Sequence, residues 1–323
     1  MRSRRVFLCS FALAALCGAP ATRAWNNTGH EIIANIAWQN LSPAAREKIT
    51  ALLHAHPDYA EYLSHSPDPA NADLHAFELA ATWPDWVRTP GRPQYRYNHP
   101  EWHFVDFPYS LPGLPDQPQP IADWKPGDNP INALQAHQKV LAVFQNQSLP
   151  DADRAIALCW IAHLDGDIHL PVHAASLFSP QFPAGDKGAN SIRFTIHDPA
   201  TGADRQSALH ALWDEMLGND QSEPVLHAEA LRLMREHPAS DMKDQLAQMD
   251  FTAWAKESFA LAREHVYLNG TLQGADANAA QNKSLPAPPL PTGYMAQAMP
   301  IADQRAALAG YRLAAELEAA FSP

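Results

Sequence analysis

The stretch His163-Leu-Asp-Gly-Asp167-Ile-His169-Leu-Pro171-Val-His173 holds the densest chemistry in the chain. On a helix, His163 and Asp167 stand four residues apart and share one face, whereas Pro171 ends or bends the helix and lets His173 approach from another direction. One helix end could therefore serve two neighbouring metal ions. A helix-surface ion pair followed by a proline turn is the alternative, since pairs at this spacing are common.

Helical patterns dominate the rest of the sequence. Ser42-Pro43 and Asn129-Pro130 each place a capping residue before a proline suited to the first turn, and the two helices are predicted to run to about His54 and Gln147. Further helices are predicted over residues 30–40, 72–87, 151–169, 208–217, 223–237, 251–268 and 299–320. Residues 106–128 are proline-rich and aperiodic, which predicts a surface loop. Residues 191–196 alternate between apolar and polar, which predicts one short β-hairpin in a mainly α, single compact multi-helix domain.

The first 24 residues have the organisation of an export signal. Basic residues come first, an apolar run follows over residues 6–16, and a small-residue end closes the segment at Ala24. This order predicts that residues 1–24 are removed and that residues 25–323 form the functional domain. The pattern Ser3-Arg4-Arg5-Val6-Phe7-Leu8 leaves both the general and the twin-arginine export route open. We expect a periplasmic or secreted protein without membrane anchoring.

Charge and cysteine content restrict the chemistry. The chain carries 23 basic and 35 acidic residues, a net charge of −12. Such a protein is a poor sequence-independent binder of polyanions, because lysine and arginine normally drive that binding. Bound metal would have to supply positive charge if nucleic acid is the substrate, and sixteen histidines make this feasible. Cys159 is the one cysteine outside the signal, which excludes an internal disulfide.

Other segments offer further ligands. His210 and Asp214 repeat the four-residue spacing on a second predicted helix, and His103 lies between two aromatic residues. Asp85 and Arg88 flank apolar residues, where a partly buried salt bridge is the alternative. His103 could equally be a satisfied core imidazole, and none of these segments decides the matter alone.

The start of the exported chain is the deciding feature. Cleavage after Ala24 would expose the α-amino group of Trp25, five residues before His30. An α-amino nitrogen and its own carbonyl oxygen can chelate one metal in a five-membered ring. The alternative is that Trp25 simply packs a terminus.

The chain resembles the zinc-dependent nuclease I family, which comprises fungal single-strand-specific and plant bifunctional nucleases and is related to bacterial zinc phospholipase C. The resemblance extends from Trp25 to Gly310-Tyr-Arg-Leu313. Its motifs occur in the family's order: Trp25/His30, Trp83-Pro-Asp85, Trp102-His103-Phe104, His163…Asp167…His173, Gly185-Asp-Lys-Gly-Ala-Asn190 and His210…Asp214.

This resemblance implies a three-zinc cluster at the bottom of a cleft. One zinc would be held by Asp85, His103, His163 and Asp167. A second would share Asp167 and take the Trp25 amine and carbonyl with His30. The third would be held by His173, His210 and Asp214.

The resemblance also implies an endonuclease that cuts single-stranded DNA and RNA to 5′-phosphorylated products, with a 3′-nucleotidase activity left open. Asp85, Arg88 and Asp167 would be catalytic, since zinc activates water for attack on phosphorus and Arg88 could neutralise phosphoryl charge. Phe104 and Asp106 match positions that bind a nucleobase. Asn190 could support the cleft or contact phosphate. The enzyme is expected to be a monomer without a stable protein partner.

The sequence leaves two other functions open. A zinc phospholipase C would use the same cluster on a choline phosphodiester, and a non-catalytic zinc-binding protein would take up metal without turnover. The sequence also departs from the family at Leu170, Lys187 and Ala189, which leaves every metal ligand intact but bears on substrate preference.

Overall fold

Helices α1 (Asn27–Asn40) and α5 (Asp151–His169) form the centre of the molecule, and their side chains are buried over most of their length. A helix enclosed on nearly every side must be covered by others. In the computed structural model, which describes residues 25–197, 202–272, 274–276 and 287–321, α5 packs against α3, α4, α9 and α10. Helix α1 packs against α3, α7 and α10. The export signal of residues 1–24 lies outside the described residues.

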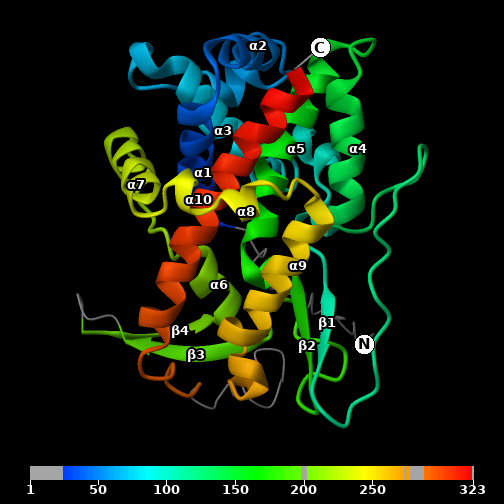
Figure 1. The fold of residues 1–323 in the computed structure, drawn as a ribbon, viewed down its shortest axis with the longest axis vertical. Helices are drawn as coiled ribbons and strands as arrows, with labels where there is room; N and C mark the ends of the chain where they lie inside the picture. The colour runs from blue at the N-terminus through cyan, green and yellow to red at the C-terminus, as the bar shows by residue number, and fades with distance from the viewer. Residues whose placement is uncertain (1–24, 198–201, 273, 277–286, 322–323) are drawn as a thin grey trace, which may run out of the picture.

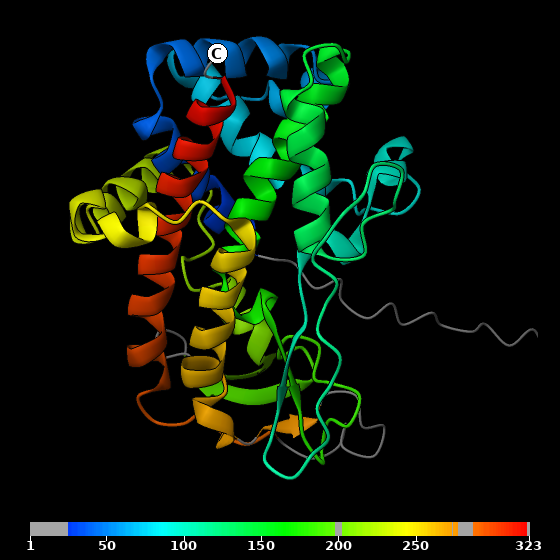
Figure 2. The same ribbon diagram turned by 45° about the vertical axis from the view of Figure 1, so that its right-hand side comes forward.

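The remaining helices surround this pair, as Figure 1 shows. They are α2 (Pro43–His54), α3 (Ala72–Trp86), α4 (Ala133–Gln145), α6 (Leu209–Asp214), α7 (Glu223–Glu236), α8 (Lys243–Leu246), α9 (Phe251–Leu261) and α10 (Tyr294–Phe321). The two views show α9 and α10 side by side and the strands gathered at one end of the molecule (Figures 1 and 2). Within the described residues, no helix combines the length and the apolar character that crossing a bilayer requires.

Local chemistry accounts for the helix ends. The Ser42 side chain accepts a hydrogen bond from the Ala45 amide, and Pro43 occupies the first turn of α2, as predicted. The predicted start of α4 at Asn129-Pro130 is wrong, because Asn132 is the capping residue and the helix begins at Ala133. Helix α5 ends at His169, where Leu170 is extended, as expected for a residue that precedes a proline.

Two small sheets accompany the helices. The predicted hairpin is present: β3 (Ile192–His197) pairs antiparallel with β4 (Asp204–Ala208), and β5 (Ala275–Asp276) adds to β3. A second sheet was not predicted. In it, β1 (Phe107–Ser110) and β2 (Ala175–Phe178) run parallel, so the segment predicted as a loop from residue 106 begins with a strand. This pairing joins the segment after His103 to the segment after His173.

Candidate active site

Five predicted ligands meet where α1, α3 and α5 converge. The carboxylate of Asp167 lies 3.2 Å from His30 Nε2, 3.2 Å from His103 Nδ1 and 3.1 Å from His163 Nε2. Asp85, near the end of α3, belongs to the same centre, since its carboxylate groups with His30 and His163 in an arrangement that could hold a metal ion. His103, His163 and Asp167 form a second such group. Because the groups share His163, they adjoin.

The third predicted group also comes together. His173, which follows the end of α5, meets His210 and Asp214 of α6 in a further arrangement that could hold a metal ion. Asp214 Oδ1 lies 3.5 Å from His210 Nε2 and 3.9 Å from His173 Nε2. These distances suit three donors around one ion better than direct hydrogen bonds.

Backbone carbonyl groups orient three of the imidazoles. His163 Nδ1 contacts the Ala81 carbonyl oxygen at 2.8 Å, His173 Nδ1 the His103 carbonyl oxygen at 2.7 Å, and His210 Nδ1 the Gly188 carbonyl oxygen at 2.5 Å. Each Nδ1–H donates to its carbonyl, so each Nε2 lone pair faces the ligand group. This outer-shell pattern is typical of histidines that bind metal.

The residues present fit a bound cation. Asp85 Oδ2, Asp214 Oδ1 and His173 Nε2 are buried and make no hydrogen bond to other described residues. Burial raises the pKa of Asp214 well above its usual range, and the nearby carboxylates of Asp167 and Asp85 raise it further. A cation would offset the cost of burying these groups.

Three of the ligand histidines are poised as neutral donors. Burial lowers the pKa of His103 to about 4, and it also lowers the pKa of His30 and His173. His163 differs: burial alone would lower its pKa, but the charge of Asp167 and the hydrogen bond to it outweigh burial and raise that pKa. Burial alone would raise the pKa of Asp167, but His163 and the hydrogen-bonding imidazoles outweigh it and bring that pKa well below its usual range. The centre thus presents an ionised Asp167 carboxylate beside the neutral imidazoles of His30 and His103.

Trp25 lies against this centre. Its indole is fully buried, and Nε1 donates a hydrogen bond of 3.1 Å to the carbonyl oxygen of Gly166 on α5. The next residue, Asn26, donates its backbone N–H to the Asp214 carbonyl oxygen at 3.1 Å. The start of α1 is therefore held between two helices that carry predicted ligands.

One cavity opens beside the three groups. It has a volume of about 340 Å³. Its lining includes three ligand histidines, the predicted catalytic arginine and the predicted substrate contacts: His103, His173 and His210; Arg88; and Phe104, Asp106 and Asn190. Arg88 Nη1 donates to Asp85 Oδ1 at 2.9 Å, which anchors the guanidinium at the cavity. Asp106 is open to solvent on the cavity side, while burial by the surrounding protein raises its pKa to about 6.

The 185–190 loop supplies cavity residues that the sequence reasoning did not assign. Lys187 and Gly188 also line the cavity. The buried carboxylate of Asp186 holds the loop, since it accepts hydrogen bonds from the Leu177 and Ala189 amides at 2.8 and 3.0 Å. Asn190 Nδ2 donates to the Lys187 carbonyl oxygen at 2.8 Å, so this side chain supports the loop. In the sequence, the position of Lys187 between Gly185 and Gly188 indicates a loop that carries a positive charge.

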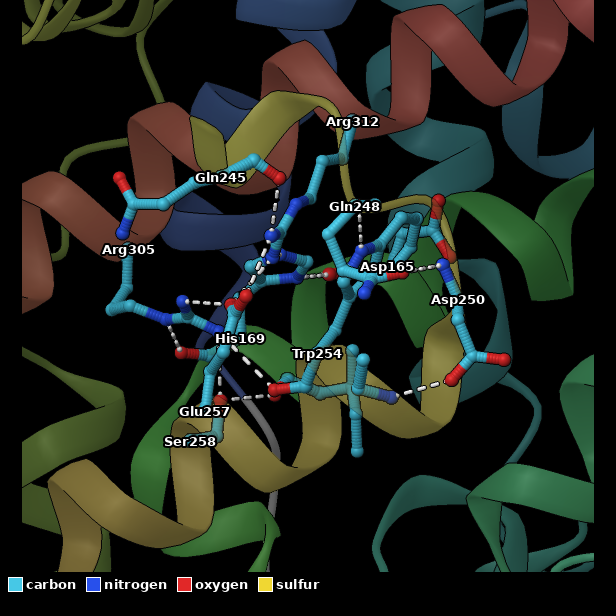
Figure 3. A network of polar contacts seen from close by, with 12 residues as sticks. Asp165, His169, Gln245, Gln248, Asp250, Trp254, Glu257, Ser258, Arg305 and Arg312 are labelled. Carbon is cyan, nitrogen blue, oxygen red and sulfur yellow. Dashed lines mark hydrogen bonds and ion pairs between the residues drawn. The ribbon is translucent and has the colours of Figure 1, made fainter. Parts of the chain in front are cut away.

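His169 belongs to none of the His/Asp groups that could hold metal in the described part of the chain. Figure 3 shows it among Arg305, Arg312 and Glu257. Its Nδ1–H donates to the Asp165 carbonyl oxygen at 2.7 Å, and its Nε2 accepts from Arg312 at 2.9 Å. Burial and the two arginines lower the pKa of His169 well below its usual range, which keeps the ring neutral for this role.

The fold and the site together define a class of protein. It is a mainly helical domain whose His/Asp groups could hold metal beside one cavity. Comparison with known proteins makes the class specific, because the family model described as S1/P1 nuclease matches residues 25–322. Endonuclease 2 of Arabidopsis thaliana is 25% identical over 312 residues, which cover 95% of this chain and 93% of the relative. Endonuclease 3 of the same plant is 24% identical over 310 residues, covering 92% of this chain and 89% of the relative.

The chain belongs to the S1/P1 nuclease family, and the resemblance inferred from its motifs is confirmed. It is a hydrolytic nuclease that acts on nucleic acid. Family membership therefore favours the nuclease over the phospholipase C and the non-catalytic zinc-binding protein.

Proposed function

We propose that this nuclease is an exported endonuclease that uses three zinc ions to hydrolyse single-stranded DNA and RNA to 5′-phosphorylated products, with 3′-nucleotidase activity at the same site. The strongest support is the meeting of three His/Asp groups beside a single cavity. Imidazole and carboxylate donors suit catalytic zinc, whereas structural zinc sites are usually rich in thiolate. Asp85, Arg88 and Asp167 are the proposed catalytic residues.

The proposed ligand sets are those that the family resemblance implies. The third set is the His173, His210 and Asp214 group, and the first two sets divide the members of the two adjoining groups differently from the arrangement in the structure. Asp85, His103, His163 and Asp167 would hold one zinc. The Trp25 amine and carbonyl with His30 would hold a second that shares Asp167. The third would be held by His173, His210 and Asp214. Zinc at these positions would lower the pKa of water toward neutrality and stabilise negative charge on phosphoryl oxygens.

The side chains of the cavity would position the substrate. Arg88 is held by Asp85 through one nitrogen, which leaves other N–H groups of the guanidinium to donate to phosphoryl oxygens as charge develops. The Lys187 ammonium adds positive charge at the same cavity. Both cations matter because the chain is acidic overall and offers little general attraction to a polyanion.

Phe104 and Asp106 account for the preference for single strands. Phe104 is half-buried at the cavity, so its ring can stack on a base, and stacking requires a base that is not already paired and stacked. The Asp106 carboxylate can accept a hydrogen bond from an exocyclic amine. Together they would bind one unpaired nucleotide beside the metal groups.

Export would complete the site. Removal of residues 1–24 would free the amine of Trp25, whose indole is held against α5. The enzyme would then act in the periplasm or outside the cell, as a monomer without membrane anchoring.

A one-residue extension tests the amine ligand most directly. The exported enzyme that begins at Trp25 is compared with a variant carrying one extra alanine before Trp25. We expect the variant to lose one zinc per chain and most of its activity on single-stranded DNA, because its free amine no longer lies at the second zinc. Zinc would be counted by elemental analysis, and the ends of the products would be determined by mass spectrometry.

Duplex DNA and phosphatidylcholine serve as comparison substrates. Slow cleavage of the duplex and no cleavage of the lipid are expected. An extended variant with full zinc content and full activity would remove the amine from the ligand set, and equal rates on single-stranded and duplex DNA would remove the proposed base stacking.

A further inference from the structure

A fourth group of metal-type donors lies on another face of α5. His137 of α4, Asp165 of α5 and Glu316 of α10 bring donor atoms within 4.8 Å of one another. Asp165 stands two residues from both His163 and Asp167, which turns its side chain away from theirs on the helix. Neither the proposed catalysis nor the 340 Å³ cavity involves these three residues.

The Asp165 carboxylate is the unusual member of this group. Its side chain is fully buried, and neither carboxylate oxygen makes a hydrogen bond to another described residue. An ionised carboxylate without such partners is costly to bury. The nearest basic group to this carboxylate in the group is His137, whose Nε2 lies 3.4 Å from Asp165 Oδ1. A divalent cation would neutralise the Asp165 and Glu316 carboxylates and leave the imidazole as a neutral donor.

The distances suit such an ion. His137 Nε2 lies 3.4 Å from Asp165 Oδ1 and 3.1 Å from Glu316 Oε1. Tetrahedral zinc with bonds of about 2.0–2.2 Å separates neighbouring donors by roughly 3.3–3.5 Å. The 3.4 Å separation is long for a hydrogen bond, yet it matches an edge of that tetrahedron.

The surroundings hold the donors in place and leave access. The His137 ring stacks on Phe251, with 3.9 Å between ring centroids and 13° between planes. The Glu316 side chain keeps 11% of its surface exposed, which gives an ion and a water ligand a route from solvent.

We infer that His137, Asp165 and Glu316 form an additional divalent-cation site of the zinc-binding type, which ties α4, α5 and α10 together. Its role is structural, since it joins three helices and lines no part of the catalytic cavity. The inference is independent of the proposed three-zinc catalysis.

Zinc counting on matched variants tests this site. Wild type, Glu316→Gln and Glu318→Gln are dialysed with zinc and then against metal-free buffer, and zinc per chain is measured. We expect Glu316→Gln to hold one zinc fewer than wild type and to melt at a lower temperature in zinc, while cleaving single-stranded DNA at the wild-type rate. Glu318→Gln removes the same charge from the same helix and should keep the wild-type zinc count.

Two further measurements make the result decisive. The one-zinc difference should persist when both proteins also carry Asp214→Asn, because that substitution affects a separate group. Crystals of wild type, grown without added zinc, should show an anomalous peak at the zinc edge between the three side chains. This measurement uses wild type alone, so it does not depend on whether Glu316→Gln folds. Equal zinc counts in wild type and Glu316→Gln, or no anomalous peak, would reduce the group to a hydrogen-bonded His137–Glu316 pair and overturn the inference.

Discussion

Gly166 shows how a residue without a side chain determines the geometry of His/Asp groups that could hold metal. It lies on α5 between His163 and Asp167, and its carbonyl oxygen accepts the Trp25 indole hydrogen bond. A Cβ atom at this position would lie 2.9 Å from His30 Nδ1 and 3.1 Å from His30 Cε1. Glycine is therefore required for His30 of α1 to reach Asp167.

Gly166→Ala is predicted to displace His30 from Asp167. Since disturbing the support of a metal ligand typically lowers metal affinity or activity by about 10–100-fold, we expect a loss of this size in nuclease activity at limiting zinc. Activity measured against free zinc concentration checks the prediction. Full activity at every zinc concentration would contradict it.

Gly310→Ala is the matched control. Its added Cβ would also crowd a buried helix contact, since it would lie 2.5 Å from Ile36 Cγ2, but no metal-type ligand is involved. This variant should lose stability and retain the wild-type zinc affinity. Comparison of Gly166→Ala with Gly310→Ala separates the effect of steric crowding in the core from the effect of displacing His30.

Asp106 is expected to make base binding depend on pH. Burial raises its pKa to about 6, so the carboxylate that accepts a hydrogen bond forms as the pH rises through that value. We predict that Asp106→Asn raises KM for single-stranded DNA about tenfold at pH 7.5 and hardly at all at pH 5, because a charge-assisted hydrogen bond is worth roughly 1.5 kcal/mol.

The KM ratio of variant to wild type, measured from pH 5 to pH 8, tests this prediction and cancels effects common to both enzymes. Asp116→Asn, in the exposed part of the same loop region, should give a ratio near one throughout. A ratio that does not change with pH would rule out titration of Asp106 as the cause.

At the scale of elements, α9 and α10 are joined by a buried charge network (Figure 3). The Glu257 carboxylate of α9 accepts hydrogen bonds from Arg305 at 2.9 Å and from two nitrogens of Arg312 at 2.7 and 2.8 Å. Both arginines are almost fully buried, and Glu257 is their charge partner. Through His169 the network also holds the end of α5, immediately before the segment that carries His173.

Glu257→Gln is predicted to lower the free energy of unfolding by about 1.5–3 kcal/mol, because it leaves two buried guanidinium groups without their counter-charge. Burial alone would raise the pKa of Glu257, but hydrogen bonds from Arg312 and Arg305 outweigh it and lower that pKa. The stabilisation is therefore present above the usual glutamate pKa and is lost as the pH falls through the depressed value.

Urea denaturation at pH 7 and at decreasing acidic pH measures both effects. The difference between wild type and Glu257→Gln should shrink in acid. Glu264→Gln, at a side chain that is 66% exposed, should change stability by less than about 0.5 kcal/mol at either pH. An equally small effect of Glu257→Gln at pH 7 would show that the network adds no stability.

At the scale of the whole molecule, the three His/Asp groups that could hold metal beside the cavity join α1, α3, α5, α6 and the segments around His103 and His173. Removing bound metal would leave buried carboxylates and imidazoles without a counter-charge. We predict that chelation abolishes nuclease activity and lowers Tm by at least about 5 °C, and that zinc restores both. Calorimetry with and without chelator, combined with zinc analysis, would check this. An unchanged Tm after complete metal loss would contradict it.

The sequence by itself determined the helices and most candidate ligands. His163 and Asp167 share a face because a helix repeats every 3.6 residues, and Pro171 ends that helix because the residue before a proline avoids the helical region. These effects are local, because they depend only on residues that are close together in the sequence. The start of α4 was misplaced because Asn129 and Asn132 are both suitable caps, and local chemistry does not choose between them.

Only the tertiary structure decided which distant segments meet. The parallel pairing of β1 with β2 holds His103 beside His173, with His173 Nδ1 on the His103 carbonyl oxygen, yet the proline-containing β1 has no recognisable strand pattern. The meeting of His137, Asp165 and Glu316 likewise depends on how three helices pack. Such contacts join residues far apart in the chain, and their energies arise from burial and charge compensation that no local sequence pattern specifies.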